Sequence, residues 1–179
     1  RAGFSHAILR HQLGALDDAG LVSELEGLKF MWRGDDLELA ILERLGELQV
    51  GQGDIAEGLK TWRGAVGLFV ETERGRRIAS RMSEVFSDLF LSGGADDMDP
   101  LAALTVYYDF RELTPIGRRG DALIRNLADR LVSFDLLDKA ADLLRHQVQN
   151  RLRGTARAQV AAKLALIELM NHEPERALQ

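Results

Sequence analysis

The fold is decided by a spacing that occurs first in Leu45-Gly46 … Gly53-Asp54-Ile55 … Gly58 … Trp62 … Ala65. The same spacing returns in Leu127-Ala128 … Asp135 … Leu137 … Ala140 … Leu144, and in Leu164-Ala165 … Glu173 … Ala177. In each copy a small residue follows a leucine, a turn comes about seven residues later, and a second small residue lies about five residues beyond the turn. Small residues at these positions let two antiparallel helices cross closely. Each pair then leaves an apolar face that only a neighbouring pair can cover, so the spacing predicts a stack of helix pairs.

The three copies define clear repeats over residues 39–72, 121–154 and 158–179. Residues 3–34 and 73–120 hold helix pairs of similar length without the spacing, and we interpret them as degenerate repeats. Gly27-Leu28-Lys29, shortly before Trp32, echoes Gly58-Leu59-Lys60, shortly before Trp62, which suggests equivalent second helices in neighbouring repeats. We therefore predict five stacked pairs in one helical-repeat domain covering residues 1–179.

Apolar residues recur at helical spacing along nearly the whole chain, and no stretch alternates as a half-buried strand would. The predicted fold class is all-α. Asp99-Pro100 should cap a helix start, while Ser92-Gly93-Gly94 and Thr114-Pro115 should end helices. The predicted helices cover residues 3–15, 18–33, 36–51, 53–70, 74–92, 100–113, 118–134, 136–152, 155–171 and 173–179.

Two sets of side chains are expected to be buried. Small residues should lie at the helix crossings, namely Gly46, Ala128, Ala140 and Ala165. Aromatic residues at helical spacing are usually part of the core, so we expect burial of Phe86, Phe90 and at least one of Tyr107 and Tyr108.

The spacing resembles the tetratricopeptide repeat, a helix-turn-helix unit of about 34 residues. This resemblance implies a right-handed superhelix whose first helices line a concave groove for an extended peptide or a partner helix. Carried over by position, the groove would use Glu43, Glu47 and Val50, then Arg125, Asp129 and Val132, then Ala162, Leu166 and Leu169.

The resemblance also bears on the partner. Chaperone-binding members of this family hold a peptide carboxylate with lysine and asparagine, but Glu43 and Glu47 stand at such sites here, so that activity is not implied. The predicted function is a protein–protein interaction scaffold. We further expect the chain to be a fragment of a longer bacterial protein of the family. It should self-associate through a C-terminal repeat face formed by Leu164, Ile167 and Leu178.

Composition excludes several classes of protein. The net charge is -5 at pH 7, which disfavours general nucleic-acid affinity. Residues 1–100 carry 11 Lys or Arg against 18 Asp or Glu, net -7, while residues 101–179 carry 12 against 10, net +2. Cysteine is absent, so the chain has no disulfide or thiolate metal site. No apolar run reaches the length of a bilayer span, and no targeting segment is visible, so the compartment, cytoplasmic or periplasmic, stays open.

The sequence contains no pattern typical of an enzyme. Nucleophile elbows, phosphate loops and zinc-protease spacings are missing, so we predict no catalysis and no cofactor. The four histidines are interpreted as surface or partly buried structural residues: His6, His11, His146 and His172. The acids of Asp96-Asp97-Met98-Asp99 fit helix capping better than cation binding. Gly117-Arg118-Arg119-Gly120-Asp121 fits a loop before an Asp-capped helix better than a phosphate loop.

Two arginine-rich faces carry the alternative function, which is binding of a phospho-ligand or nucleic acid. One face covers residues 74–81, where positive charge at a helix start is unfavourable and suggests a partner or an acidic neighbour. The other covers residues 145–163, inside a run from 143 to 167 without Asp or Glu. Either could dock an acidic peptide or a phosphate group, although a solvated face also explains both.

Overall fold

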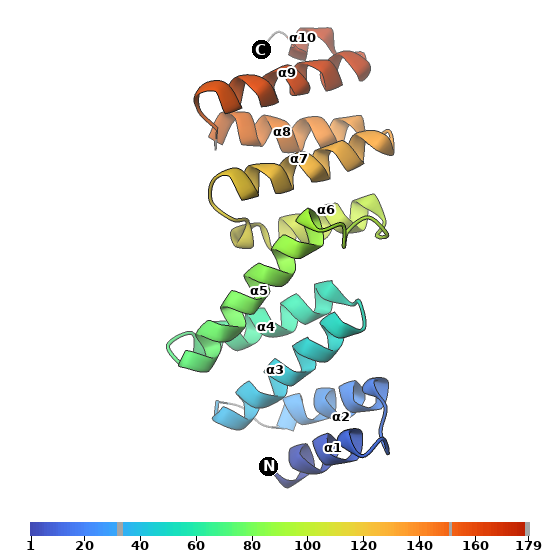
Figure 1. Cartoon of the computed structure of the whole chain (residues 1–179), viewed down its shortest axis with the longest axis vertical. Helices are drawn as coiled ribbons and strands as arrows, with labels where there is room; N and C mark the ends of the chain where they lie inside the picture. Colours follow the sequence, from blue (N-terminus) through green and yellow to red (C-terminus); the bar gives the residue numbers. More distant parts are fainter. Residues whose placement is uncertain (32–33, 151, 178–179) are drawn as a thin grey trace. The chain divides into compact units, whose positions relative to one another are not determined.

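The computed structural model describes residues 1–31, 34–150 and 152–177. Within these ranges the chain is helical and contains no strand, which confirms the all-α prediction (Figure 1). Contacts divide the chain into two compact units, Arg1–Val85 and Phe86–Gln179. The helices are α1 (Ala2–Gln12), α2 (Asp18–Met31), α3 (Asp36–Gly51), α4 (Ile55–Phe69), α5 (Glu73–Leu91), α6 (Pro100–Asp109), the 3-10 helix η1 (Arg111–Leu113), α7 (Arg118–Ser133), α8 (Leu137–Asn150), α9 (Gly154–Met170) and α10 (Pro174–Ala177).

The helix ends follow the signals in the sequence. The Asp99 carboxylate accepts hydrogen bonds from the backbone N–H groups of Leu101 and Ala102, each at 3.0 Å, and Pro100 is the first residue of α6. Gly93, with φ of +84°, follows the end of α5. These predictions of helix boundaries are confirmed. Trp32, whose sequence context echoes that of Trp62, lies outside the described residues, as do positions 178–179.

Each turn from a first to a second helix of a predicted pair contains a residue in the left-handed conformation. These residues are Gly14, Gly53, Gly93, Asp135 and His172, with φ between 59° and 88°. A left-handed residue just after a helix satisfies the last carbonyl groups through backbone bonds, and glycine adopts this conformation without strain. Asp135 and His172 adopt it with a side chain, which the glycine pattern of the sequence did not reveal.

The replacement of Asp135 by glycine should therefore stabilise the protein. A non-glycine residue in the left-handed region is strained, and relief of that strain should exceed the added chain entropy of glycine by up to about 1 kcal/mol. Urea unfolding monitored by circular dichroism would measure the change, with the reverse substitution Gly53→Asp as the control of opposite sign. A lower unfolding midpoint for Asp135→Gly would mean that the carboxylate contributes more than the strain costs.

The core of the first unit joins α1, α2 and α3, and α3 also crosses α4 closely. A Cβ on Gly46 would lie 2.3 Å from Nε1 of Trp62, and a Cβ on Gly58 would lie 2.5 Å from Cγ2 of Val50. Both glycines are buried, so the crossing depends on small residues, as the spacing predicted. The buried residues of the α1–α3 cluster are Ala7, Leu21, Leu25, Leu37, Ile41, Leu45 and Leu48.

In the second unit, Ala128 on α7 and Ala140 on α8 are completely buried, which confirms both predictions. The rings of Phe86 and Phe90 lie 5.1 Å apart, and the Phe86 and Tyr107 rings lie 6.5 Å apart. All three rings are buried while Tyr108 is exposed, as expected of one tyrosine. These contacts join the end of α5 to α6.

The loop between α5 and α6 is held by side chains of α7. The Arg130 guanidinium donates to the carbonyl oxygens of Asp96, at 2.7 Å, and Met98. The Asn126 amide donates to the carbonyl oxygen of Phe90 at 3.3 Å. These bonds satisfy carbonyl groups near the end of α5 and in the loop, so α7 fixes the position of that loop within the second unit.

The predicted start of a helix at Arg118 is confirmed, but the role given to Asp121 and the end of the helix over 100–113 need correction. The segment from Gly117 to Asp121 is not a loop before an Asp-capped helix, because α7 begins at Arg118 and Gly117, with φ of +77°, precedes it. Asp121 lies in the first turn, where its oxygen accepts from Gln147 Nε2 at 3.3 Å. The helix expected over 100–113 ends at Asp109, since the chain turns at the fully buried Phe110 and continues as η1.

The face of α9 also needs correction. Ala165 is half-buried rather than buried, because α10, which packs against α9, has only four residues and covers a short length of it. Ile167 is buried, so the predicted uncovered face of Leu164, Ile167 and Leu178 is wrong at Ile167. Leu164 is half-buried, and Leu178 lies outside the described residues.

Candidate functional site

A hollow of about 450 Å³ opens beside α3 in the first unit. Trp62 and Ile78 are almost completely buried beneath it, whereas the charged side chains at its edge reach solvent. The predicted groove residues Glu43 and Glu47 therefore face a real depression between α3 and α5. Its lining residues are Glu43, Glu47, Trp62, Arg77, Ile78 and Arg81.

A second hollow of about 450 Å³ lies on the side of α3 that faces α1. Glu43 and Glu47 line both hollows, so the two carboxylates of α3 stand between them. First helices of consecutive predicted pairs, α1, α3 and α5, thus contribute to one continuous surface. The second hollow is lined by Phe4, Ile8, His11, Gln12, Ala40, Glu43, Arg44, Glu47 and Arg74.

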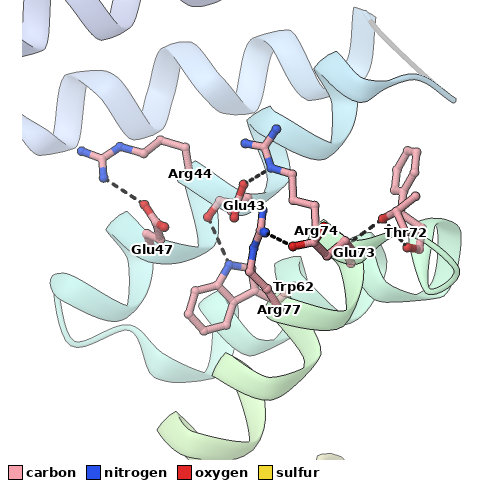
Figure 2. Close-up of polar contacts among 10 residues, drawn as sticks. Glu43, Arg44, Glu47, Trp62, Thr72, Glu73, Arg74 and Arg77 are labelled. Carbon is pink, nitrogen blue, oxygen red and sulfur yellow. Dashed lines mark hydrogen bonds and ion pairs between the residues drawn. The ribbon is translucent and has the colours of Figure 1, made fainter.

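The charges of this surface are arranged in pairs (Figure 2). The Arg74 guanidinium donates to the Glu43 carboxylate, and Arg44 donates to Glu47 at 3.0 Å. The indole N–H of Trp62 donates to the backbone carbonyl of Glu43 at 3.1 Å, which ties the base of the hollow to α3. The carboxylate of Glu43 is the acidic neighbour that the arginines at the start of α5 suggested.

The remaining arginines of residues 74–81 make more exposed contacts. Arg77 pairs with Glu73 at 2.8 Å, and Arg81 pairs with Glu84 at 3.6 Å, with all four side chains more than 60% exposed. Exposed pairs of this kind contribute little to stability, typically about 0.3–0.5 kcal/mol within one helix. The guanidinium groups at the edge of the first hollow are therefore free to exchange their own carboxylate for another at low cost.

The third predicted residue of this group is placed elsewhere. Val50 is half-buried, and its Cγ2 lies at the crossing with α4 next to Gly58, so it lines neither hollow. Conversely, sequence reasoning missed Trp62 and Ile78 as the base of the hollow. The available signal was Gly46 opposite Trp62. A glycine on the first helix leaves room for the bulky ring of the second helix to cross it and reach the far side.

In the second unit, the predicted groove residues lie on two adjacent first helices. Lys163 on α9 forms an ion pair with Asp129 on α7, which shows that these helices face each other. Arg125 and Val132 are half-buried and Asp129 is exposed on α7, while Ala162, Leu166 and Leu169 are all exposed on α9. The α7 part of this surface is polar and the α9 part is apolar.

The arginine-rich face of residues 145–163 contains an ion pair between the half-buried Arg145 and a buried carboxylate, which the sequence did not reveal. Arg145 donates to the Glu168 carboxylate, which is 1% exposed, and to Asp142 at 2.6 Å. Burial lowers the pKa of Arg145, but the hydrogen bonds that it donates to the Glu168 and Asp142 carboxylates outweigh this effect and raise the pKa above its usual value. Glu168 is the first acidic residue after the run from 143 to 167. It meets Arg145 because α9 packs against α8.

Other polar groups have local roles. His11 contacts the Asp18 carboxylate at 2.5 Å and is half-buried, while His6, His146 and His172 are exposed, which confirms their predicted surface or partly buried positions. Burial raises the pKa of Tyr108, and the nearby Asp142 carboxylate adds to that effect while Arg111 opposes it. In the described part of the chain, no three His, Asp or Glu side chains gather as a metal site would require. Across the same residues, no helix has the length and apolar character needed to cross a bilayer.

No family model matches the sequence, and no curated protein matches it. Among solved structures, the chain is similar to BtubC (BKLC) from P. vanneervenii, with 18% identity and a TM-score of 0.37 over 96% of this chain and 72% of that chain. Values this low do not transfer a fold or a function.

Proposed function

We propose that this chain is a non-enzymatic scaffold related to the tetratricopeptide repeat proteins, and that it binds a peptide or a partner protein along its first helices. Five side-chain contacts within the units support the repeat interpretation, because each connects residues 31 to 36 positions apart, close to one repeat of about 34 residues. These contacts join Glu43 to Arg74, Phe90 to Asn126, Asp96 to Arg130, Asp129 to Lys163 and Asp138 to Asn171.

The observation that carries the proposal is the pair of hollows that share Glu43 and Glu47. Each combines buried or half-buried apolar side chains with charged groups at the edge, a composition that suits a ligand with both apolar and charged groups. A peptide lying across α3 would place an apolar side chain over Trp62 and Ile78 and would extend toward α1. Each charged group of the peptide would take the place of one partner in an exposed ion pair around the hollows.

Peptide selection followed by a matched pair of variants tests this proposal. Peptides selected on the wild-type chain should bind Glu47→Ala about 5- to 30-fold more weakly, since loss of a central contact typically costs about 1–2 kcal/mol. Glu57→Ala is the control, because Glu57 also pairs with a cation three residues away, Lys60, but lines neither hollow. Fluorescence of Trp62 in a Trp32→Phe background would report occupancy. Equal affinity for both variants would place binding elsewhere.

The alternative function, phospho-ligand or nucleic-acid binding through residues 74–81 and 145–163, is less favoured. Arg74 and Arg145 both donate to carboxylates of this chain that are largely removed from solvent, so they are neutralised before any phosphate arrives. Phosphate binding would weaken steeply as salt is raised, whereas a peptide anchored over Trp62 would depend mainly on its apolar side chain.

A further inference from the structure

The exposed face of α9 differs from that of α7, the first helix beside it. The solvent-facing residues of α7 are all polar, namely Arg118, Arg119, Asn126, Asp129 and Ser133. On α9, the exposed residues between positions 158 and 170 include no charged side chain: Ala158, Gln159, Ala162, Leu166, Leu169 and Met170. Leu166, Leu169 and Met170 are 58%, 54% and 49% exposed, which is unusual for large apolar side chains grouped on one helix.

Two of the three charged side chains of α9 form ion pairs with neighbouring helices. Lys163 is bound by the Asp129 carboxylate of α7, and Glu168 is buried against Arg145 of α8. The third, Arg157, is exposed but lies on the side of the helix opposite the exposed face, so these charges do not solvate that face. The face therefore needs an apolar partner, and its pattern of residue sizes indicates which one.

The six exposed positions of α9 between residues 158 and 170 are symmetric about residue 164. Ala158 and Met170 lie equally far from that centre, as do Gln159 and Leu169, and as do Ala162 and Leu166. In an antiparallel pair of identical helices centred at 164, the small Ala158 and Ala162 of one copy would meet the large Met170 and Leu166 of the other. A two-fold interface requires this kind of self-complementary surface.

Helix-packing geometry agrees with this arrangement. Ala158, Ala162, Leu166 and Met170 form one row of residues four apart, and packing of two such rows is the commonest mode of helix association in globular proteins.

We propose that the α9 face, defined as the six exposed residues from Ala158 to Met170, binds a second copy of this chain in an antiparallel, two-fold dimer. The contact is one helix wide and about 18 Å long, from a rise of about 1.5 Å per residue. Stable complexes bury about 800 Å² per partner, and one helix face provides less, so the dimer belongs to the weak, concentration-dependent class. This proposal does not depend on the hollows of the first unit.

Sedimentation equilibrium over about a hundred-fold range of concentration tests the dimer, because mass action raises the dimer fraction with concentration. The wild-type mass should rise toward twice the monomer mass, and Leu166→Glu should remain monomeric. Ile116→Glu is the control, since Ile116 is 99% exposed in the same unit but lies outside α9. A wild-type chain that stays monomeric throughout would overturn the proposal, and so would equal loss of association in both variants.

Crosslinking tests the register, because the chain contains no cysteine of its own. A mixture of Ala158→Cys and Met170→Cys chains should form a disulfide-linked heterodimer. Ala158→Cys alone should not crosslink, since in the antiparallel register its two copies lie about 18 Å apart along the helix axis. Efficient crosslinking of Ala158→Cys with itself would show parallel pairing and overturn the proposed arrangement.

Discussion

Replacement of Arg145 by leucine should lower the free energy of unfolding by about 3–5 kcal/mol, the usual cost of leaving a buried charge without its partner. The Glu168 carboxylate is 1% exposed and accepts a hydrogen bond from Arg145 through Oε1. Within the described residues its other oxygen, Oε2, is buried without a hydrogen-bond partner, so Arg145 is the group that compensates the charge. The raised pKa of Arg145 means that its guanidinium remains protonated through neutral pH.

Two further variants separate the buried charge from a general effect of arginine loss. Arg81→Leu removes an arginine whose partner, Glu84, is 63% exposed, so its effect should stay below about 1 kcal/mol. The double variant Arg145→Leu with Glu168→Leu should recover most of the lost stability, because an apolar pair can replace a buried ion pair at little cost. Urea unfolding followed by circular dichroism measures all three. If Arg145→Leu were no worse than Arg81→Leu, the contact of Arg145 with the buried Glu168 would contribute nothing beyond a surface ion pair.

Truncation of Trp62 to alanine should have a comparable effect, with a loss of about 3–5 kcal/mol. The side chain is 2% exposed, and its indole N–H donates to the carbonyl of Glu43 at 3.1 Å. Truncation removes both the contacts of the ring and that hydrogen bond, and it leaves a cavity between α3 and α4. It should also abolish peptide binding in the first hollow, whose base the ring forms.

Gly46→Ala tests the crossing of α3 with α4, and Gly64→Ala on the exposed side of α4 is a control with the opposite expected sign. Gly64 on α4 is exposed, and a Cβ added there would meet no atom within 4 Å, so Gly64→Ala should stabilise the helix by about 0.5–1 kcal/mol. Gly46→Ala should instead destabilise the protein by about 1–3 kcal/mol, because its Cβ would lie 2.3 Å from the Trp62 ring. A stabilising Gly46→Ala would show that Trp62 moves away at no cost.

Local signals in the sequence determined the helices, their ends and much of the core. Periodicity, Asp99-Pro100 and Gly93 describe a few neighbouring residues at a time, and helix formation and capping depend on such short ranges. The small residues Gly46 and Ala128 were identified for the same reason, because close helix crossings need them wherever they occur. Composition and motif spacing supplied the expectation that this chain binds rather than catalyses, which remains a proposal.

Only the tertiary structure decided which distant residues meet. The partnership of Glu43 with Arg74, and of Arg145 with Glu168, depends on the register between helices, because the paired residues are 31 and 23 positions apart in sequence. The same register places Trp62 beneath a hollow and leaves the apolar side of α9 exposed. The left-handed Asp135 also required the structure, since aspartate can adopt that conformation but its presence does not demand it. Sequence periodicity determines which face of each helix is apolar, whereas packing decides what that face meets.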